Sequence, residues 1–111
     1  INETPLHKAV EARDFLKVKK MIEAGADVNA QTTQGITPLF LAISEFSRDR
    51  KQEYLEIAKS LIDNGADLET KFYGKTPYED AVEFKVEEIA EYIKNKEDSE
   101  KTEMLEGVKN Q

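Results

Sequence analysis

Three residue types that carry much of protein chemistry are nearly missing from this chain of 111 residues, which has no cysteine, no tryptophan and a single histidine, His7. Without cysteine the chain can form neither a disulfide scaffold nor a cysteine-ligated zinc site. With no second histidine either, we expect no Cys–His or Ser–His nucleophilic centre. The absence of cysteine fits a reducing compartment, so we expect an intracellular, cytoplasmic protein, with delivery into a host cell as an open alternative.

Long apolar runs are also absent. No stretch approaches the ~20 apolar residues needed to cross a bilayer, so we expect no membrane partner. The five glycines are isolated along the sequence, which excludes a glycine-rich phosphate loop. The sequence begins at Ile1 rather than at methionine, which indicates a fragment of a longer protein and leaves an upstream signal peptide open.

The charge of the chain is predominantly negative. The formal net charge is −7, and residues 76–111 hold eleven acidic residues against five basic ones. A nucleic-acid binder needs a basic surface, so nucleic acid is not an expected partner. The carboxylates form no catalytic or metal-binding pattern, because Glu87, Glu88 and Glu91 are expected on a solvent-facing helix side and no oxygen ligands stand at calcium-loop spacing. We therefore expect no enzyme, no metal and no cofactor.

What the chain contains instead is an internal repeat. A Thr-Pro pair opens the same four-residue motif three times, at Thr4 to His7 (TPLH), Thr37 to Phe40 (TPLF) and Thr76 to Glu79 (TPYE). An alanine stands five residues after each threonine, and the first two copies lead to a Gly-Ala-Asp run at residues 25–27 and 65–67. Repetition at a period of this size predicts a solenoid of stacked units.

Each copy of the motif predicts the start of a short helix, because threonine is a good helix cap and proline is preorganised for the first helical position. These first helices are expected at residues 5–12, 38–45 and 77–84. A second helix, with apolar residues at helical spacing, follows each of them. Gly25 and Gly65 then stand where a left-handed residue ends the second helix.

The units differ in length. The first two motifs are 33 residues apart and the next two are 39 apart, so we place about seven inserted residues in a loop within Phe46 to Glu53. The charged run inside this segment is expected to be solvated surface. Arg13 stands in the turn between the first two helices, and a side chain there is unfavourable if the turn needs a left-handed backbone. We expect either a rebuilt turn there or a small loss of stability.

The third unit has the character of a cap. The inward stripe of its second helix consists of Val86, Ile89, Ala90 and Ile93. Lys94 takes the place of an inward isoleucine, and the acidic outer face suits a terminal repeat. Residues 97–111 are strongly polar, and we expect a frayed helix or disorder there. Their one apolar cluster, at Met104, Leu105 and Val108, can bury little surface.

These features together resemble the ankyrin repeat, whose period is 33 residues and whose signature reads T-P-L-H-x-A. Residues 4–30 match that pattern, with T-P-L-H-K-A-V, a second helix and then G-A-D-V-N-A. The resemblance implies an all-α solenoid of stacked helix-turn-helix units with β-hairpin-like loops. It divides the chain into a repeat domain at residues 1–96 and an acidic tail at residues 97–111. The units are expected at about 1–33, 34–72 and 73–96.

The resemblance also implies binding of another protein rather than catalysis, and a structural role for His7. The binding surface in this family is a concave groove, lined by the hairpin tips and by the exposed sides of the first helices. The expected partner-binding residues are Glu11, Ala12, Thr33, Gln34, Ile36, Ser44, Glu45, Phe72, Tyr73, Lys75, Glu83 and Phe84.

Three aromatic residues of this set, Phe72, Tyr73 and Phe84, are expected to converge between the second and third units. Aromatic residues dominate interface hot spots, and a hairpin tip gives them no core duty. They either bind a partner or are covered by the tail or another part of a longer protein. The inserted segment around Arg48 to Lys51 is the competing surface.

Two functions stay open at this point, and both use the same groove. One is a non-enzymatic, monomeric protein-interaction module. The other is the recognition domain of a larger enzyme or effector whose catalytic region lies outside this sequence. Fold alone does not name the ligand, so the partner itself is not predicted.

Overall fold

The computed structural model describes the backbone of residues 3–109 and the side chains of residues 3–100. Its helices are α1 (Pro5–Glu11), α2 (Phe15–Glu23), α3 (Pro38–Asp49), α4 (Gln52–Asp63), α5 (Pro77–Glu83) and α6 (Glu87–Lys109). Within the described residues, the only β-type pairing is an isolated bridge between Phe72 and Lys75. The predicted all-α repeat fold is confirmed.

The three predicted threonine caps start the first helix of each unit. The hydroxyl oxygens of Thr4, Thr37 and Thr76 each accept a hydrogen bond from the backbone N–H three residues later, with proline at the start of the helix. Glu79 completes the predicted capping box by accepting from the Thr76 N–H at 2.9 Å. This backbone bond lowers the pKa of the Glu79 carboxyl below its usual value. Capping therefore fixes where each unit begins.

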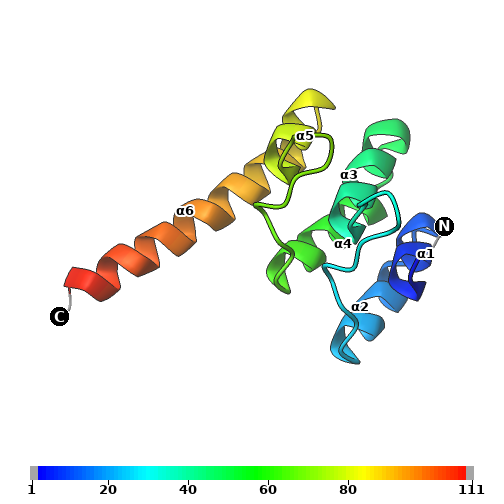
Figure 1. Ribbon diagram of the computed structural model, residues 1–111, viewed down its shortest axis with the longest axis horizontal. Helices are drawn as coiled ribbons and strands as arrows, with labels where there is room; N and C mark the ends of the chain where they lie inside the picture. Colours follow the sequence, from blue (N-terminus) through cyan, green and yellow to red (C-terminus); the bar gives the residue numbers. More distant parts are fainter. Residues whose placement is uncertain (1–2, 110–111) are drawn as a thin grey trace.

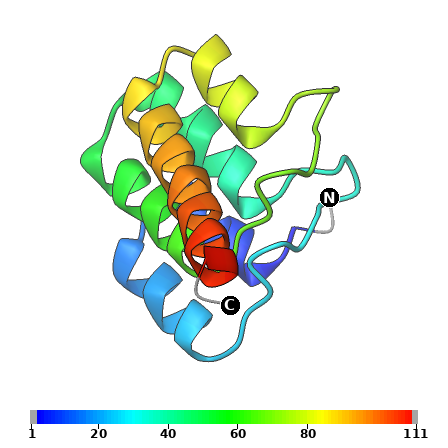
Figure 2. The same ribbon diagram turned by 90° about the vertical axis from the view of Figure 1, so that its left-hand side faces the viewer.

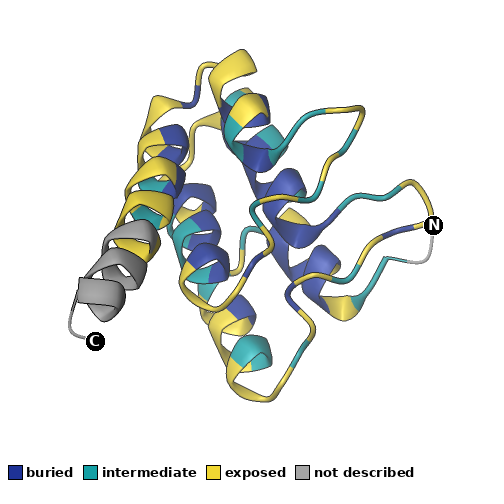
Figure 3. Cartoon of the chain, turned by 60° about the vertical axis from the view of Figure 1, so that its left-hand side comes forward, coloured by how far each residue is buried: buried dark blue, intermediate teal, exposed yellow. Residues whose placement is uncertain are grey.

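The helices form two layers (Figure 1). The first helices α1, α3 and α5 pack side by side in one layer, and the second helices α2, α4 and α6 pack in the other. Nearly all of the buried apolar side chains form one cluster between the layers, while the connecting loops are mostly exposed (Figure 3). Each unit therefore buries its apolar face against its neighbours, as stacked repeats do.

The loops that join successive units project to one side of the helix layers, at the right of Figure 2. Gly25 and Gly65 have φ of 96° and 95°, as predicted for residues that end the second helices. Asn29 then ties the first loop to the second. Its Nδ2 donates to the Gly65 carbonyl at 3.1 Å, and its Oδ1 accepts from the Asp67 N–H at 2.7 Å. The loops are thus held in register by side-chain bonds.

The turn at Arg13 is left-handed and is not rebuilt. Its φ is 59°, and the corresponding turns of the next two units place Arg50 and Lys85 at φ of 58° and 60°. The guanidinium of Arg13 lies 3.7 Å from Asp49 and 3.9 Å from Glu53, both in the second unit. A side chain at this strained position therefore reaches across to the next unit.

The insertion in the second unit is not a loop, so that prediction was wrong. The extra residues lengthen both helices, and α3 and α4 have 12 residues each, whereas α1 has 7 and α2 has 9. Phe46 and Tyr54 are 3% and 4% exposed and extend the core between the longer helices. Burial of these two large rings explains the extra turns, because an apolar face stabilises the helix that carries it. The charged residues Arg48, Asp49 and Arg50 are exposed, as predicted.

The second helix of the third unit has the inward stripe that was expected. Val86, Ile89, Ala90 and Ile93 are buried, and Lys94 is exposed. The backbone of α6 continues through residues 96 and 97, so the predicted boundary with a tail falls inside a helix. The side chains of the predicted apolar cluster (Met104, Leu105 and Val108) lie outside the described residues. No helix in the described part of the chain is both long and apolar enough to cross a membrane.

Candidate functional site

The loop before α5 is a tight hairpin with an exposed tyrosine at its tip. Phe72 and Lys75 exchange backbone hydrogen bonds of 2.9 and 3.2 Å, which leaves Tyr73 and Gly74 as a two-residue turn. Both turn residues have positive φ, 52° for Tyr73 and 78° for Gly74, as a type I′ turn requires. The Tyr73 residue is 88% exposed. A large aromatic residue therefore occupies a strained backbone position while burying almost nothing.

A pocket of about 350 Å³, which we name the hairpin pocket, lies between this hairpin and the first helices of the second and third units. The residues that line it are Ile36, Phe40, Leu41, Ser44, Phe72, Tyr73, Lys75, Asp80, Glu83 and Phe84. Five of the ten are aliphatic or aromatic groups that retain some exposure: Ile36, Leu41, Phe72, Tyr73 and Phe84. Its volume lies at the small end of the range for ligand pockets, about 300–1,000 Å³.

Phe72 is the packing centre of the pocket. Its ring lies 5.5 Å from the ring of buried Phe40 and 4.5 Å from the ring of Tyr73. The expectation that hairpin aromatics have no core duty was therefore wrong for Phe72, which is half-buried against α3. It remains correct for Tyr73, whose ring contacts Phe72 but stays in solvent. Phe72 holds the hairpin against the stack, and Tyr73 is presented by it.

The polar groups of the pocket are Asp80 at its wall and the Lys75–Glu83 ion pair at its rim. Asp80 is 8% exposed. Burial raises the pKa of its carboxyl above the usual value, and the Lys75 ammonium offsets part of that rise. In the described part of the chain, no hydrogen bond or ion pair engages the Asp80 carboxylate. An apolar pocket therefore contains one largely buried acid.

The structure brings seven of the twelve predicted site residues to this pocket: Ile36, Ser44, Phe72, Tyr73, Lys75, Glu83 and Phe84. The other five lie outside this pocket. Glu11 and Ala12 are exposed at the end of α1, and Thr33 and Gln34 are exposed on the first connecting loop. Glu45 accepts hydrogen bonds from Arg48 at 3.2 Å and from the Tyr54 hydroxyl at 3.4 Å. Binding by any of the twelve stays a prediction.

Three pocket residues were not predicted from the sequence: Phe40, Leu41 and Asp80. Phe40 occupies the place of His7 in the motif, and Leu41 and Asp80 stand one position later in their copies. A periodic reading could have found Leu41 and Asp80, because equivalent positions in a repeat face the same side of the stack. The burial of Asp80 could not be read in this way, because it depends on the hairpin packing over it.

His7 has the structural role that was expected. It is fully buried, its Nδ1 accepts a hydrogen bond from the Thr4 hydroxyl at 2.8 Å, and its Nε2 donates to the Ile36 carbonyl at 2.8 Å. In the second unit Phe40 replaces this histidine, and its contact with Phe72 replaces the bond to the following loop. Both nitrogens of the imidazole are thus hydrogen-bonded, one of them to the first connecting loop, and the ring is buried.

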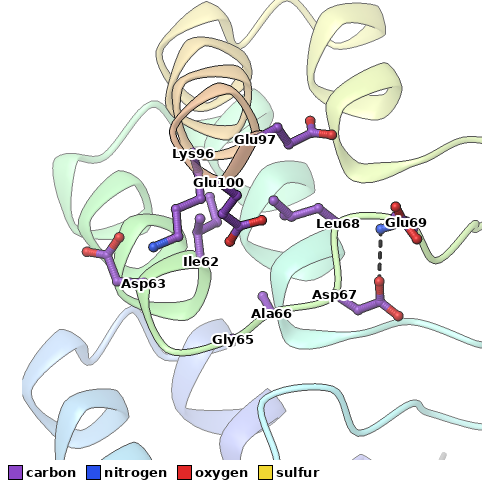
Figure 4. Close-up of a pocket in the computed structure, with 10 residues that line it drawn as sticks. All are labelled: Ile62, Asp63, Gly65, Ala66, Asp67, Leu68, Glu69, Lys96, Glu97 and Glu100. Atoms are coloured by element: carbon purple, nitrogen blue, oxygen red, sulfur yellow. Dashed lines mark hydrogen bonds between the residues drawn. The ribbon is translucent and has the colours of Figure 1, made fainter. Parts of the chain in front are cut away.

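A second pocket, of about 410 Å³, lies between α6 and the loop after α4 (Figure 4). Its acidic side chains are spread around the opening rather than pointed at one centre, and Asp67 accepts from the backbone of Glu69. Among the described residues, no group of three or more histidine, cysteine or acidic side chains could hold a metal ion. This pocket lacks the aromatic lining of the hairpin pocket.

Comparisons with known proteins agree with the repeat and the layered helices. A family model described as ankyrin repeats (3 copies) matches residues 6–103, which is most of the chain. A search of curated proteins found no match. The matched range includes α1 from its second residue, all of α2 to α5, both connecting loops and most of the long final helix. The chain therefore belongs to the ankyrin repeat family.

Proposed function

We propose that this chain is a non-enzymatic binding module that grips another protein through the hairpin pocket and the groove around it. Ankyrin repeats are generally protein-interaction modules, and this chain has three of them. The described residues also offer no catalytic arrangement that competes with this proposal, since the one histidine is enclosed and engaged on both nitrogens. A recognition domain within a larger enzyme would use the same surface.

The single observation that carries the proposal is the exposed tyrosine at the hairpin tip. Tyr73 is the most exposed of the large hydrophobic residues, at 88%, and it stands beside Phe84, which is 43% exposed on the same pocket. A left-handed tyrosine is unfavourable for folding, and strained backbone is concentrated at functional sites. Exposed aromatic rings next to an apolar pocket form the type of patch on which interface hot spots occur.

The proposal is tested with a partner recovered by affinity capture and mass spectrometry and then purified. We expect Tyr73→Ala to weaken its binding by about 1–4 kcal/mol in titration calorimetry, as hot-spot truncations do. Leu16→Ala is the matched control, because Leu16 is 61% exposed on α2 of the first unit, away from the pocket. Its affinity should equal that of the unchanged protein.

The competing surface is the exposed basic run at the end of α3. Because the insertion is helical and carries Phe46 and Tyr54 into the core, deleting it would disrupt the fold. Arg48→Ala with Lys51→Ala instead removes two exposed charges and leaves both helices in place. Loss of binding in this double variant, together with normal binding by Tyr73→Ala, would move the interface to that surface.

A further inference from the structure

We propose that the hairpin pocket receives an arginine side chain of the partner protein, with its guanidinium group against Asp80 and its stem against the rings of Tyr73 and Phe84. This inference rests on the proposed function and names the chemistry that the pocket selects. Its two supports are a buried carboxylate without a partner and an aromatic lining around it.

Asp80 is the first support. Asp80 is only 8% exposed as a residue, and an acidic residue with so little exposure is ordinarily paired, because an unpaired buried charge is destabilising. Here neither an ion pair nor a hydrogen bond engages its oxygens within the described residues. No fully enclosed polar side-chain atom of those residues lacks a partner, so the Asp80 oxygens still reach a surface. That surface is the hairpin pocket, whose wall Asp80 forms.

The aromatic lining is the second support. Phe72, Tyr73 and Phe84 border the pocket, and the two rings of the hairpin meet edge to face at 66°. Ring faces attract cations, and the attraction grows when the cation is removed from water. A cation that enters this pocket therefore gains both the carboxylate and the rings. An acidic side chain would gain neither, and a purely apolar one would leave Asp80 unpaired.

Arginine fits this combination better than lysine. Its guanidinium is planar, stacks on aromatic faces, binds a carboxylate through two parallel N–H groups and is more weakly hydrated than an ammonium group. The pocket is also small, about 350 Å³, which suits one protruding side chain. The negative charge of the chain, −7 overall, favours approach of a basic segment.

Lys75 does not fill the role of this cation. Its ammonium acts on Asp80 from a distance, but its ion pair is with Glu83 at the rim. Because Glu83 neutralises Lys75, the incoming guanidinium meets one acid, Asp80, whose charge is not already paired. Glu83 and Lys75 together then form a polar rim around the entry, which is the usual surrounding of a buried hot spot.

The test titrates the ¹⁵N-labelled full chain with N-acetyl-arginine amide as the probe. Binding of the probe is measured from the shifts of the backbone amides in ¹⁵N–¹H NMR spectra. We expect saturable shifts of amides in residues 72–84, weaker shifts with the lysine analogue and none with the citrulline analogue, which has the same shape without the charge. Asp80→Asn should abolish the arginine shifts. Glu23→Gln, which removes one exposed charge from the end of α2, should leave them unchanged. Equal shifts with arginine and citrulline would overturn the proposal.

The purified partner separates this inference from the proposed function. If both are correct, Asp80→Asn weakens partner binding by about 30-fold or more, the range for loss of one member of a buried charge pair. Full binding by Asp80→Asn with loss in Tyr73→Ala would overturn the arginine assignment and retain the binding surface. Full binding by both variants would overturn the proposed function as well. Circular dichroism of each variant verifies that the fold is intact.

Discussion

Tyr73 combines two properties that rarely occur together in one residue. Its backbone is left-handed, which costs an ordinary side chain roughly 1–2 kcal/mol, and its ring is almost wholly in solvent. Asparagine tolerates the same backbone, and alanine does not. Both substitutions remove the ring and its edge contact with Phe72. Comparing Tyr73→Asn with Tyr73→Ala therefore separates the effect of losing the ring, which both variants share, from the effect of backbone strain, in which they differ.

We predict that Tyr73→Asn is more stable than Tyr73→Ala by about 1 kcal/mol, the strain that asparagine relieves. Urea denaturation of the two variants measures this difference. Both should bind the partner equally weakly, because the ring supplies the contact. Equal stability of the two variants would show that the left-handed turn is not strained. Unequal binding would show that the backbone rather than the ring matters to the partner.

Asp80 should make stability depend on pH in a defined direction. Its folded pKa is raised by burial, so the folded state holds this proton more tightly than the unfolded state does. The burial penalty is therefore present at pH values above the folded pKa and disappears below the ordinary value of 3.8. We predict that Asp80→Asn is more stable than the unchanged protein at pH 7.

The gap between the two proteins should narrow as the pH falls from the raised folded pKa of Asp80 towards 3.8, and it should be closed below 3.8. Comparing them at each pH cancels the effects of the other acids, including the rim residue Glu83. Thermal melts over a series of buffers provide the measurement. A gap that stays constant would mean that folding does not shift the pKa of Asp80. A gap that favours aspartate at neutral pH would mean that Asp80 is stabilised by a partner within the chain.

The sequence predicted the aromatic part of this site better than its acid. Tyr73 precedes a glycine at a loop tip, so its exposure follows from local turn chemistry. Phe84 ends a short helix that the motif already located. Asp80 looked like one of many acids near a helix start, and the sequence does not show that it lines the same pocket as Phe40 of the preceding unit. Nonlocal packing of that kind leaves no periodic signal.

At the scale of elements, the turns between the two helices of the first and second units contain arginine, although glycine would relieve the left-handed backbone strain there. The contacts of each arginine with the next unit offset this strain. Arg50 donates a hydrogen bond to the Lys85 carbonyl at 3.0 Å, lies 5.4 Å from the Phe46 ring and pairs with Glu88 at 3.8 Å. Among the described residues, Arg13 makes two exposed ion pairs with the second unit, at 3.7 and 3.9 Å. Both arginines connect one unit to the next, but Arg50 does so through a hydrogen bond, a ring contact and an ion pair, and Arg13 through ion pairs.

We predict that Arg50→Gly is less stable than Arg13→Gly by about 1 kcal/mol, the net contribution of one hydrogen bond. Glycine relieves the same left-handed strain at both turns, and exposed ion pairs add only about 0–1 kcal/mol. Guanidinium chloride denaturation compares the two variants. If Arg13→Gly were the less stable, the ion pairs with Asp49 and Glu53 would be the stronger connection between units.

The length of the second unit shows where sequence reasoning stops at this scale. The spacing of the motifs reveals the insertion, but insertions in repeats usually map to loops between elements, and the charged centre of this one indicates solvated surface. Phe46 and Tyr54, at its edges, belong to the core and carry α3 and α4 onward by extra turns. Helical spacing of two rings across a charged interruption is too sparse to outweigh the charge pattern.

At the scale of the whole molecule, stability should depend on a residue's place in the stack. Leu61 of α4 and Ile93 of α6 are both fully buried, but α4 packs against α2 and α6, whereas α6 closes one end. We predict a loss of about 2–5 kcal/mol for Leu61→Ala and a smaller loss for Ile93→Ala. Equal losses in denaturant melts would contradict the assignment of the third unit as a cap.

The central claim is that the partner binds on the side of the molecule where the hairpin meets the first helices. Mapping amide shifts of the ¹⁵N-labelled chain on titration with the purified partner tests it most directly, because every element reports separately. We predict that the largest shifts fall on the hairpin, on α5 and on the first turns of α3, with α2 unaffected. Shifts confined to the layer of α2, α4 and α6 would contradict the claim.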